Sequence, residues 1–219
     1  MVPGWDLQSS RAALELAERH APLIQAAVGL HPHYAAQADE RSWRELEALA
    51  ADPRCAAVGE IGLDYFRNLS PPDVQRAAFA RQLDLAADRG LPVIVHDRDA
   101  HEEVTAALAG LSGSARGVLH AFSGDPAMAE LLVARGFLVS FALPITFRSA
   151  AGQRAAAAAV GPETYLLETD APYLGPDRDG RNEPTTTLRV AAEVARLRGI
   201  EPQAVADEVR AAYERLVAS

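Results

Sequence analysis

The chain has 219 residues, 49% of them apolar, enough to bury one substantial core without disulfides. Its single cysteine, Cys55, excludes an intramolecular disulfide and suits a reducing compartment. With 30 acidic and 21 basic side chains the net charge is −9, which disfavours a long, sequence-independent contact with nucleic acid phosphates. No run approaches the ~20 apolar residues of a membrane span, and the first residues show no signal-peptide pattern, so we expect a cytoplasmic protein with no membrane partner.

Short apolar runs alternate with longer amphipathic stretches along the whole chain. The apolar runs predict strands at residues 23–30, 56–59, 92–95, 117–119, 137–141 and 165–167. Apolar residues that return at intervals of three and four predict helices at 9–19, 42–50, 72–89, 100–108, 126–135, 153–159, 185–198 and 202–216. This alternation is typical of repeated βα units around a parallel sheet.

Six clear strands and the apolar stub at residues 1–3 make about seven βα units, where a closed barrel needs eight. We therefore predict an α/β fold, a TIM-type (β/α) barrel with the first βα unit missing. One domain is expected over residues 1–219. An open doubly wound sheet is the alternative, because it tolerates fewer strands and also keeps its site at the carboxyl ends of strands.

Four predicted strands end at a side chain that can bind a metal ion. Glu60 follows the strand at 56–59, and the other strand ends carry His96, His120 and the pair Glu168 and Asp170. Since the carboxyl ends of parallel strands lie on one face of a barrel, we expect these groups to converge. Imidazole and carboxylate ligands suit Zn, Mn or Mg, whose bound water becomes a nucleophile near neutral pH. Any one of them alone would more often be structural, but the repetition over four strands indicates a metal site.

Six segments resemble, in the same order, the motifs of the TatD family of metal-dependent nucleases. They are VGLHPH at 28–33, VGEIGLDY at 58–65, PVIVH at 92–96, HAFSG at 120–124, LETDAPYL at 167–174 and RNEP at 181–184. The resemblance covers the chain from about Val2 onward. It implies a TIM-type barrel, a divalent metal site and phosphodiester hydrolysis, with DNA as the usual substrate and strand ends as the point of attack.

The resemblance also implies roles for individual residues. Glu60 corresponds to the carboxylate that binds or bridges metal, and His96 and His120 to ligands of the second metal position. Asp170 corresponds to the remaining ligand and to the proton acceptor for the attacking water, so Glu60 and Asp170 are the expected catalytic residues. Magnesium is the expected ion, with manganese or zinc as alternatives.

Three further side chains are expected to bind substrate. His31 resembles a family position near the substrate phosphate, and Arg98 could pair bidentately with phosphate oxygens. Tyr65, placed with Asp64 in a predicted loop on the active face, could stack on the substrate or hydrogen-bond to it, although closing the loop is an equal alternative. His33 is given no role.

Three other residues are interpreted as supporting. Glu168 lies two residues before Asp170, which on a strand puts both on one face, so it either supports the metal site or is a buried carboxylate beside a basic group. Asn182 and Glu183 resemble a family motif that orders the last loop of the active face.

The start of the chain departs from the family pattern. Family members open with a strand that ends in His-x-His, and no such pair precedes Val2. We expect that Met1 is not the natural start and that about 40 more residues lie upstream, one βα unit and the start of the next. Without that unit, two strand edges would lack a partner, which would favour a homo-oligomer through the exposed barrel edge.

Three functions stay open at this point. The first is a metal-dependent deoxyribonuclease that acts on DNA ends, or on a small phosphodiester. The second is a catalytically weakened barrel that serves in binding or assembly. The third is a related metal hydrolase acting on a lactone, an amide or a small phosphate ester, because the fold does not fix the substrate.

Overall fold

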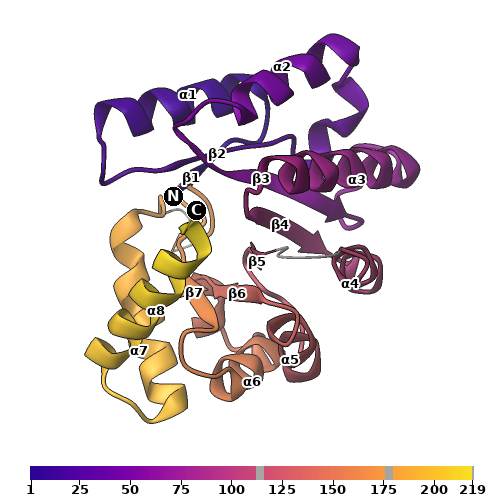
Figure 1. Ribbon diagram of the computed structural model, residues 1–219. Coiled ribbons are helices and arrows are strands. Elements are labelled where there is room, and N and C mark those ends of the chain that lie inside the picture. The colour runs from indigo at the N-terminus through magenta and orange to yellow at the C-terminus, as the bar shows by residue number, and fades with distance from the viewer. Residues whose placement is uncertain (112–115, 176–179, 219) are drawn as a thin grey trace. The chain divides into compact units, whose positions relative to one another are not determined.

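The computed structural model describes residues 1–111, 116–175 and 180–218. Its contacts divide the chain into two compact units, Met1–Gly117 and Val118–Ala218. Figure 1 labels the helices and strands of both, and each unit is described by itself. The expectation of a single domain over residues 1–219 stays a prediction.

The first unit is built on parallel strands that pair in chain order. They are β1 (Val2–Pro3), β2 (Ala26–Val28), β3 (Cys55–Asp64) and β4 (Val93–Arg98). The helices are α1 (Leu7–Arg19), α2 (Glu40–Ala50), α3 (Pro72–Arg89) and α4 (His101–Ala109), and a 3-10 turn, η1, spans Pro32–Gln37. Helix α1 packs against β2 and α3 against β3 (Figure 1).

Local sequence signals set the limits of these helices. Asp6 caps α1 by accepting a hydrogen bond from the Ser9 amide at 2.7 Å, and the Ser9 hydroxyl accepts one from the Asp6 amide at 2.9 Å. Helix α3 begins at Pro72 and ends before Gly90, whose φ of 64° is a left-handed conformation that suits glycine. The apolar faces of α1 and α2 meet β2 in a buried core, including Leu14, Val28, Leu46 and Ala50.

Strand β3 is longer than predicted. It runs through Asp64, whereas the pattern predicted an end at Gly59, so the placement of Asp64 in a loop is wrong. The strand continues because its glycines let β4 approach closely: a Cβ on Gly62, at φ 138°, would lie 2.0 Å from the backbone oxygen of His96. Val58 and Ile61 pair with Val93 and Val95, so β3 holds one extra residue there, a bulge beside Glu60.

The second unit has the same alternation. Strand β5 (Gly117–Leu119) begins at the boundary, and β6 (Phe137–Phe141) and β7 (Tyr165–Leu167) pair in parallel, with Val139 opposite Tyr165. The helices are α5 (Pro126–Val133), α6 (Ala151–Ala159), α7 (Thr187–Arg198) and α8 (Pro202–Val217), with 3-10 turns η2 (Leu143–Thr146) and η3 (Pro184–Thr186).

Most predicted elements are confirmed, with shifts at their ends. The strand predicted at 23–30 is only Ala26–Val28, and Leu23 is 90% exposed. The strands at 117–119, 137–141 and 165–167 and the helix at 72–89 have the predicted bounds. Cys55 is buried, as expected of a core thiol, and burial raises its pKa to about 11. Within the described ranges, no helix is long and apolar enough to cross a membrane.

Candidate metal centre

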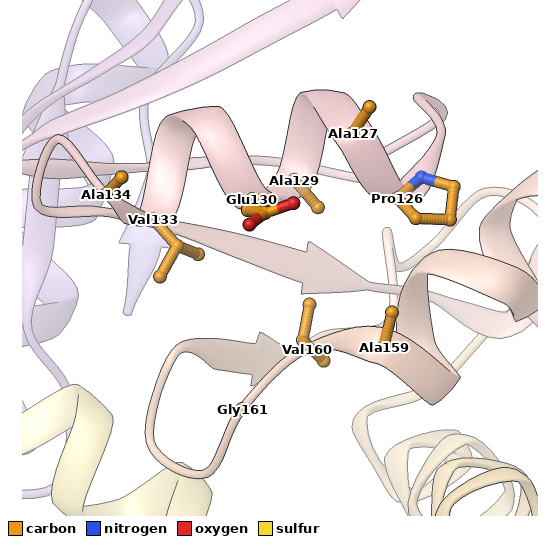
Figure 2. Close-up of a pocket in the computed structure, with 9 residues that line it drawn as sticks. All are labelled: Pro126, Ala127, Ala129, Glu130, Val133, Ala134, Ala159, Val160 and Gly161. Atoms are coloured by element: carbon orange, nitrogen blue, oxygen red, sulfur yellow. The ribbon is translucent and has the colours of Figure 1, made fainter.

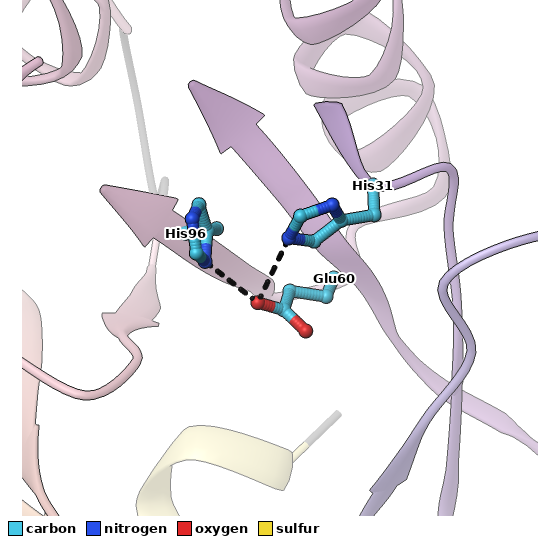
Figure 3. A group of neighbouring side chains, drawn as sticks. All are labelled: His31, Glu60 and His96. Atoms are coloured by element: carbon cyan, nitrogen blue, oxygen red, sulfur yellow. Dashed lines mark hydrogen bonds and ion pairs between the residues drawn. The ribbon is translucent and has the colours of Figure 1, made fainter. Parts of the chain in front are cut away.

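The first cluster of site residues gathers around the Glu60 carboxylate. His31 follows β2, Glu60 lies at the bulge of β3, and His96 lies in β4. Glu60 Oε1 is 2.9 Å from His96 Nδ1 and 3.6 Å from His31 Nε2, and Figure 3 shows both imidazoles turned toward this oxygen. One ligand atom from each of the three lies within 4.8 Å of the others, a spacing that suits a metal ion. The three side chains are between 9% and 16% exposed.

Asp64 supports this cluster from the end of β3. Its side chain is 1% exposed, and its Oδ2 lies 3.2 Å from His96 Nε2 and 2.7 Å from His33 Nε2. Burial alone would raise the pKa of Asp64, but hydrogen bonds from His96, the Arg67 amide and His33 outweigh it and hold the pKa below its usual value. The sequence left the role of Asp64 undecided and indicated no role for His33. Period-two spacing from Glu60 to Asp64 along one strand was the signal that could have found Asp64.

Each ring nitrogen of His96 faces a carboxylate. When a neutral ring donates its proton from Nε2 to Asp64, Nδ1 keeps its lone pair. That lone pair then faces Glu60 Oε1 at 2.9 Å, an arrangement of two acceptors that needs a cation between or beside them. A second ring proton or a bound metal ion would satisfy it, and the donor set fits a divalent metal.

His31 has the opposite arrangement. Its Nδ1 accepts a hydrogen bond from the His33 amide at 3.2 Å, so the neutral ring carries its proton on Nε2. Burial lowers the pKa of His31 to about 3, because the opposing charges of Glu60 and Asp64 do not offset the loss of solvent. His31 is therefore a neutral hydrogen-bond donor through Nε2 at neutral pH.

The second cluster lies in the second unit, around His120. The carboxylate of Glu168 contacts His120 Nδ1, and Asp170 Oδ1 lies 3.7 Å from His120 Nε2. Glu168 also accepts hydrogen bonds from the Ser140 hydroxyl and the Ala121 amide. Burial alone would raise the pKa of Glu168, but His120 and these donors keep it below its usual value. This imidazole too has a carboxylate at each nitrogen, an arrangement that suits a metal ligand oriented by a carboxylate.

The chain turns sharply at Asp170. Strand β7 ends at Leu167, and Asp170 has a φ of 59°, so Glu168 and Asp170 are not alternate residues of one strand, as the sequence suggested. The loop is held by Asn182, whose side-chain amide donates to the Thr169 carbonyl and, at 3.3 Å, to the Leu174 carbonyl. Its amide oxygen accepts from Thr186 Oγ1 at 2.6 Å. Asn182 therefore orders the loop that carries Asp170.

The structure thus pairs Glu60 with His96 in the first unit and His120 with Asp170 in the second. That all four converge on one volume stays a prediction. Tyr65 donates its hydroxyl hydrogen to Glu103 at 3.0 Å, a contact that supports the structural alternative for this residue.

An apolar hollow of about 660 Å³ lies elsewhere in the second unit. It is open between α5 and the segment after α6, and Figure 2 shows its lining of small side chains around Val133, Val160 and Glu130. It contains none of the predicted metal ligands, so it is not a candidate for the chemistry.

The α/β fold and the imidazole–carboxylate clusters are those of a metal-dependent hydrolase. The model of the family "TatD related DNase" matches residues 1–218, and the chain belongs to this family. The resemblance seen in the sequence is thereby confirmed.

Individual relatives agree with this assignment. The chain is 35% identical to an uncharacterised metal-dependent hydrolase, YabD, of Bacillus subtilis, over 90% of this chain and 78% of that protein. It is 38% identical to a protein of Edwardsiella piscicida named 3'-5' ssDNA/RNA exonuclease TatD, over 90% of this chain and 79% of the relative. The crystal structure of YjjV, a TatD homologue from Escherichia coli, superposes with a TM-score of 0.90 at 31% identity, covering 98% of this chain and 84% of that one. This match confirms the predicted TIM-type α/β fold.

Proposed function

We propose that this protein hydrolyses phosphodiester bonds at the ends of single-stranded nucleic acid and that it needs a divalent metal ion. The observation that carries the proposal is the pair of imidazoles with a carboxylate at each nitrogen, His96 and His120, which calls for a cation. The relatives named as ssDNA/RNA exonucleases support the substrate class. Magnesium is our proposed ion, and a cytoplasmic location is part of the same proposal.

The proposed ligands are Glu60 and His96 from the first unit and His120 and Asp170 from the second. A bound divalent ion would supply a hydroxide-like nucleophile and neutralise charge on the phosphate. With a metal ion bound, Asp64 and Glu168 would accept the ring protons of His96 and His120 on the nitrogens away from the ligand positions.

The remaining chemistry belongs to the chain's own donors and acceptors. Asp170 accepts the proton of the attacking water, since its left-handed backbone turns the carboxylate toward His120 Nε2. His31 donates its Nε2 hydrogen to a phosphate oxygen, a role that its buried, neutral ring can fill without a change of protonation.

The test is metal content together with hydrolysis. Purified protein should contain near-stoichiometric divalent metal by elemental analysis and degrade an end-labelled single-stranded oligonucleotide when Mg, Mn or Zn is supplied. Asp170→Asn should remove most of the rate, because the amide keeps the shape and loses the charge and the proton acceptor. Asp207→Asn is the matched control, because Asp207 forms an exposed ion pair with Arg210 on α8. Its hydrolysis rate should equal that of the wild type.

Mild salt dependence is expected, because a chain of net charge −9 contacts only a few phosphates. Metal-free protein with no hydrolysis of any phosphodiester would favour the weakened barrel. Hydrolysis of a lactone or amide in preference to the oligonucleotide would favour the third function instead.

A further inference from the structure

An exposed aromatic ring follows the strand that carries Glu60 and Asp64. Phe66 is 61% exposed, although the guanidinium carbon of Arg98 lies 4.0 Å from its ring centroid. The cation therefore covers one part of the ring, and a large part of the aromatic surface remains open to solvent. A stacked Arg and Phe pair at an exposed site is a weak interaction, so it does not by itself explain why the ring is exposed to solvent.

The loop that presents Phe66 is fixed by hydrogen bonds on both sides of the ring. The Tyr65 amide donates to the Arg98 carbonyl at 2.9 Å, and the Arg67 amide donates to Asp64 Oδ1 at 2.7 Å. Beyond them, the buried Gln75 donates to the Asn68 side chain at 3.3 Å. The ring is thus presented from a backbone that is already ordered, which lowers the entropy cost of binding a ligand.

The stacked pair of Phe66 and Arg98 lies next to the first cluster of site residues. Asp64 pairs with Arg98 in the register of β3 and β4, just as Gly62 pairs with His96. The same Asp64 carboxylate contacts His96 through Oδ2 and the Arg67 amide through Oδ1. Arg98 therefore lies in β4 two residues after His96 and opposite Asp64, and Phe66 lies in the turn two residues after Asp64.

The net charge of the protein indicates which contact with a ligand the exposed Phe66 ring provides. A chain of net charge −9 gains little from phosphate neutralisation, so its affinity for a nucleic acid strand must come from other contacts. A base stacked on an aromatic ring contributes about 1–3 kcal/mol and needs no sequence match. Among residues 1–111, 116–175 and 180–218, Arg98 makes no ion pair, and its planar group suits a phosphate oxygen.

We propose that Phe66 and Arg98 form a base-stacking subsite for single-stranded nucleic acid. A nucleobase next to the scissile bond stacks on the open surface of Phe66, and Arg98 holds a phosphate oxygen of the same strand. The proposal rests on the proposed function and names how its substrate is selected: bases paired inside a duplex are not available to the ring, whereas unpaired bases are.

Binding can be tested without hydrolysis. The affinity of the metal-depleted protein for a fluorescent oligothymidylate should fall about 5- to 100-fold in Phe66→Ala. Phe66→Trp should keep wild-type affinity. Leu69→Ala is the matched control, since Leu69 is 62% exposed in the same loop and should not contribute. An equal loss in Phe66→Ala and Leu69→Ala, or no loss in either, would overturn the subsite.

Hydrolysis of abasic strands separates stacking from general damage. Phe66→Ala should raise KM for a normal strand and leave KM unchanged for a strand whose terminal nucleotides lack bases, with kcat little affected in both. Arg98→Gln should raise KM for both strands. Equal effects of Phe66→Ala on the two strands would overturn stacking, and so would a changed oligomeric state with unchanged KM, which would make Phe66 a contact between copies.

The two proposals fail in different ways. If wild-type protein hydrolyses no phosphodiester yet Phe66→Ala loses oligonucleotide binding, the proposed function is wrong and the subsite stands. If hydrolysis is normal and binding does not depend on Phe66, the function stands and the subsite is wrong.

Discussion

The two units hold their central histidines in different ways. In the first unit His96 lies inside a strand, and its carboxylate neighbours both come from the adjacent strand, Glu60 at the bulge and Asp64 in the regular pairing beyond it. In the second unit the carboxylates follow the end of β7, and Asp170 depends on a turn held by the side chain of Asn182. The first cluster is set by backbone pairing and the second by side-chain hydrogen bonds, so the same kind of substitution should have different consequences in each.

The largest effect should follow loss of the Glu60 carboxylate. Glu60→Gln removes the carboxylate whose Oε1 faces both His31 and His96, so we expect activity to fall by about 10³-fold or more and metal content to fall with it. Elemental analysis of Glu60→Gln and Asp170→Asn measures the metal content of both variants and so compares the two clusters. If metal content falls in Asp170→Asn and not in Glu60→Gln, the second cluster contributes more to metal binding than the first, contrary to this prediction.

The next effect concerns the carboxylates that orient the imidazoles. In Asp64→Asn the amide can donate to His96 Nε2, which would move the ring proton to Nδ1, where a metal would bind. We expect metal affinity to fall about 10- to 100-fold, and the same for Glu168→Gln. Glu208→Gln, which removes a carboxylate bonded to the Tyr165 hydroxyl at 2.8 Å, is the control and should leave metal affinity intact. Unchanged affinity in Asp64→Asn would deny it an orienting role.

A smaller effect is expected where the second cluster depends on its loop. Asn182→Ala removes three side-chain hydrogen bonds around Thr169, Leu174 and Thr186 and should lower the free energy of unfolding by about 1–3 kcal/mol. Because Asp170 loses its fixed turn, kcat should fall more than KM changes. Thr164→Ala removes one hydrogen bond, from Thr164 Oγ1 to the Gly161 carbonyl at 2.8 Å. It should lower the free energy of unfolding less than Asn182→Ala and leave kcat unchanged. Equal loss of kcat in both variants would contradict the role of Asn182.

The smallest effect, measured over a single pH unit, should be the pH dependence from His31. Its folded pKa of about 3 lies below the ordinary value of 6.5, so between these values the unfolded chain binds a proton that the folded chain does not. The free energy of unfolding of metal-free protein should therefore fall as the pH drops from 6.5, by at most about 1.4 kcal/mol per pH unit from this group. Urea unfolding of wild type and His31→Gln at two pH values measures it, with exposed His20→Gln as control. Parallel curves for wild type and His31→Gln would show that His31 does not contribute.

The sequence predicted the order and kind of elements well where a short apolar run was bounded by turn residues, as at Phe137–Phe141. It failed at β3, where Gly59, Glu60 and Gly62 interrupt the apolar run. A glycine in the sequence indicates the end of a strand when the neighbouring strand is unknown. In the fold these glycines admit the backbone of β4, which only the tertiary structure reveals.

By itself, the sequence determined the fold class and the identity of the imidazoles and carboxylates, because these follow from periodicity and from residue types placed at strand ends, and its six motifs indicated the family by resemblance. The tertiary structure decided which of them touch, and that Asp64 and Glu168 contact the imidazoles of His96 and His120, with His33 bonded to Asp64. Those choices depend on distances between residues far apart in the chain, such as the 2.9 Å from Glu60 to His96, and no local pattern encodes a distance of that kind.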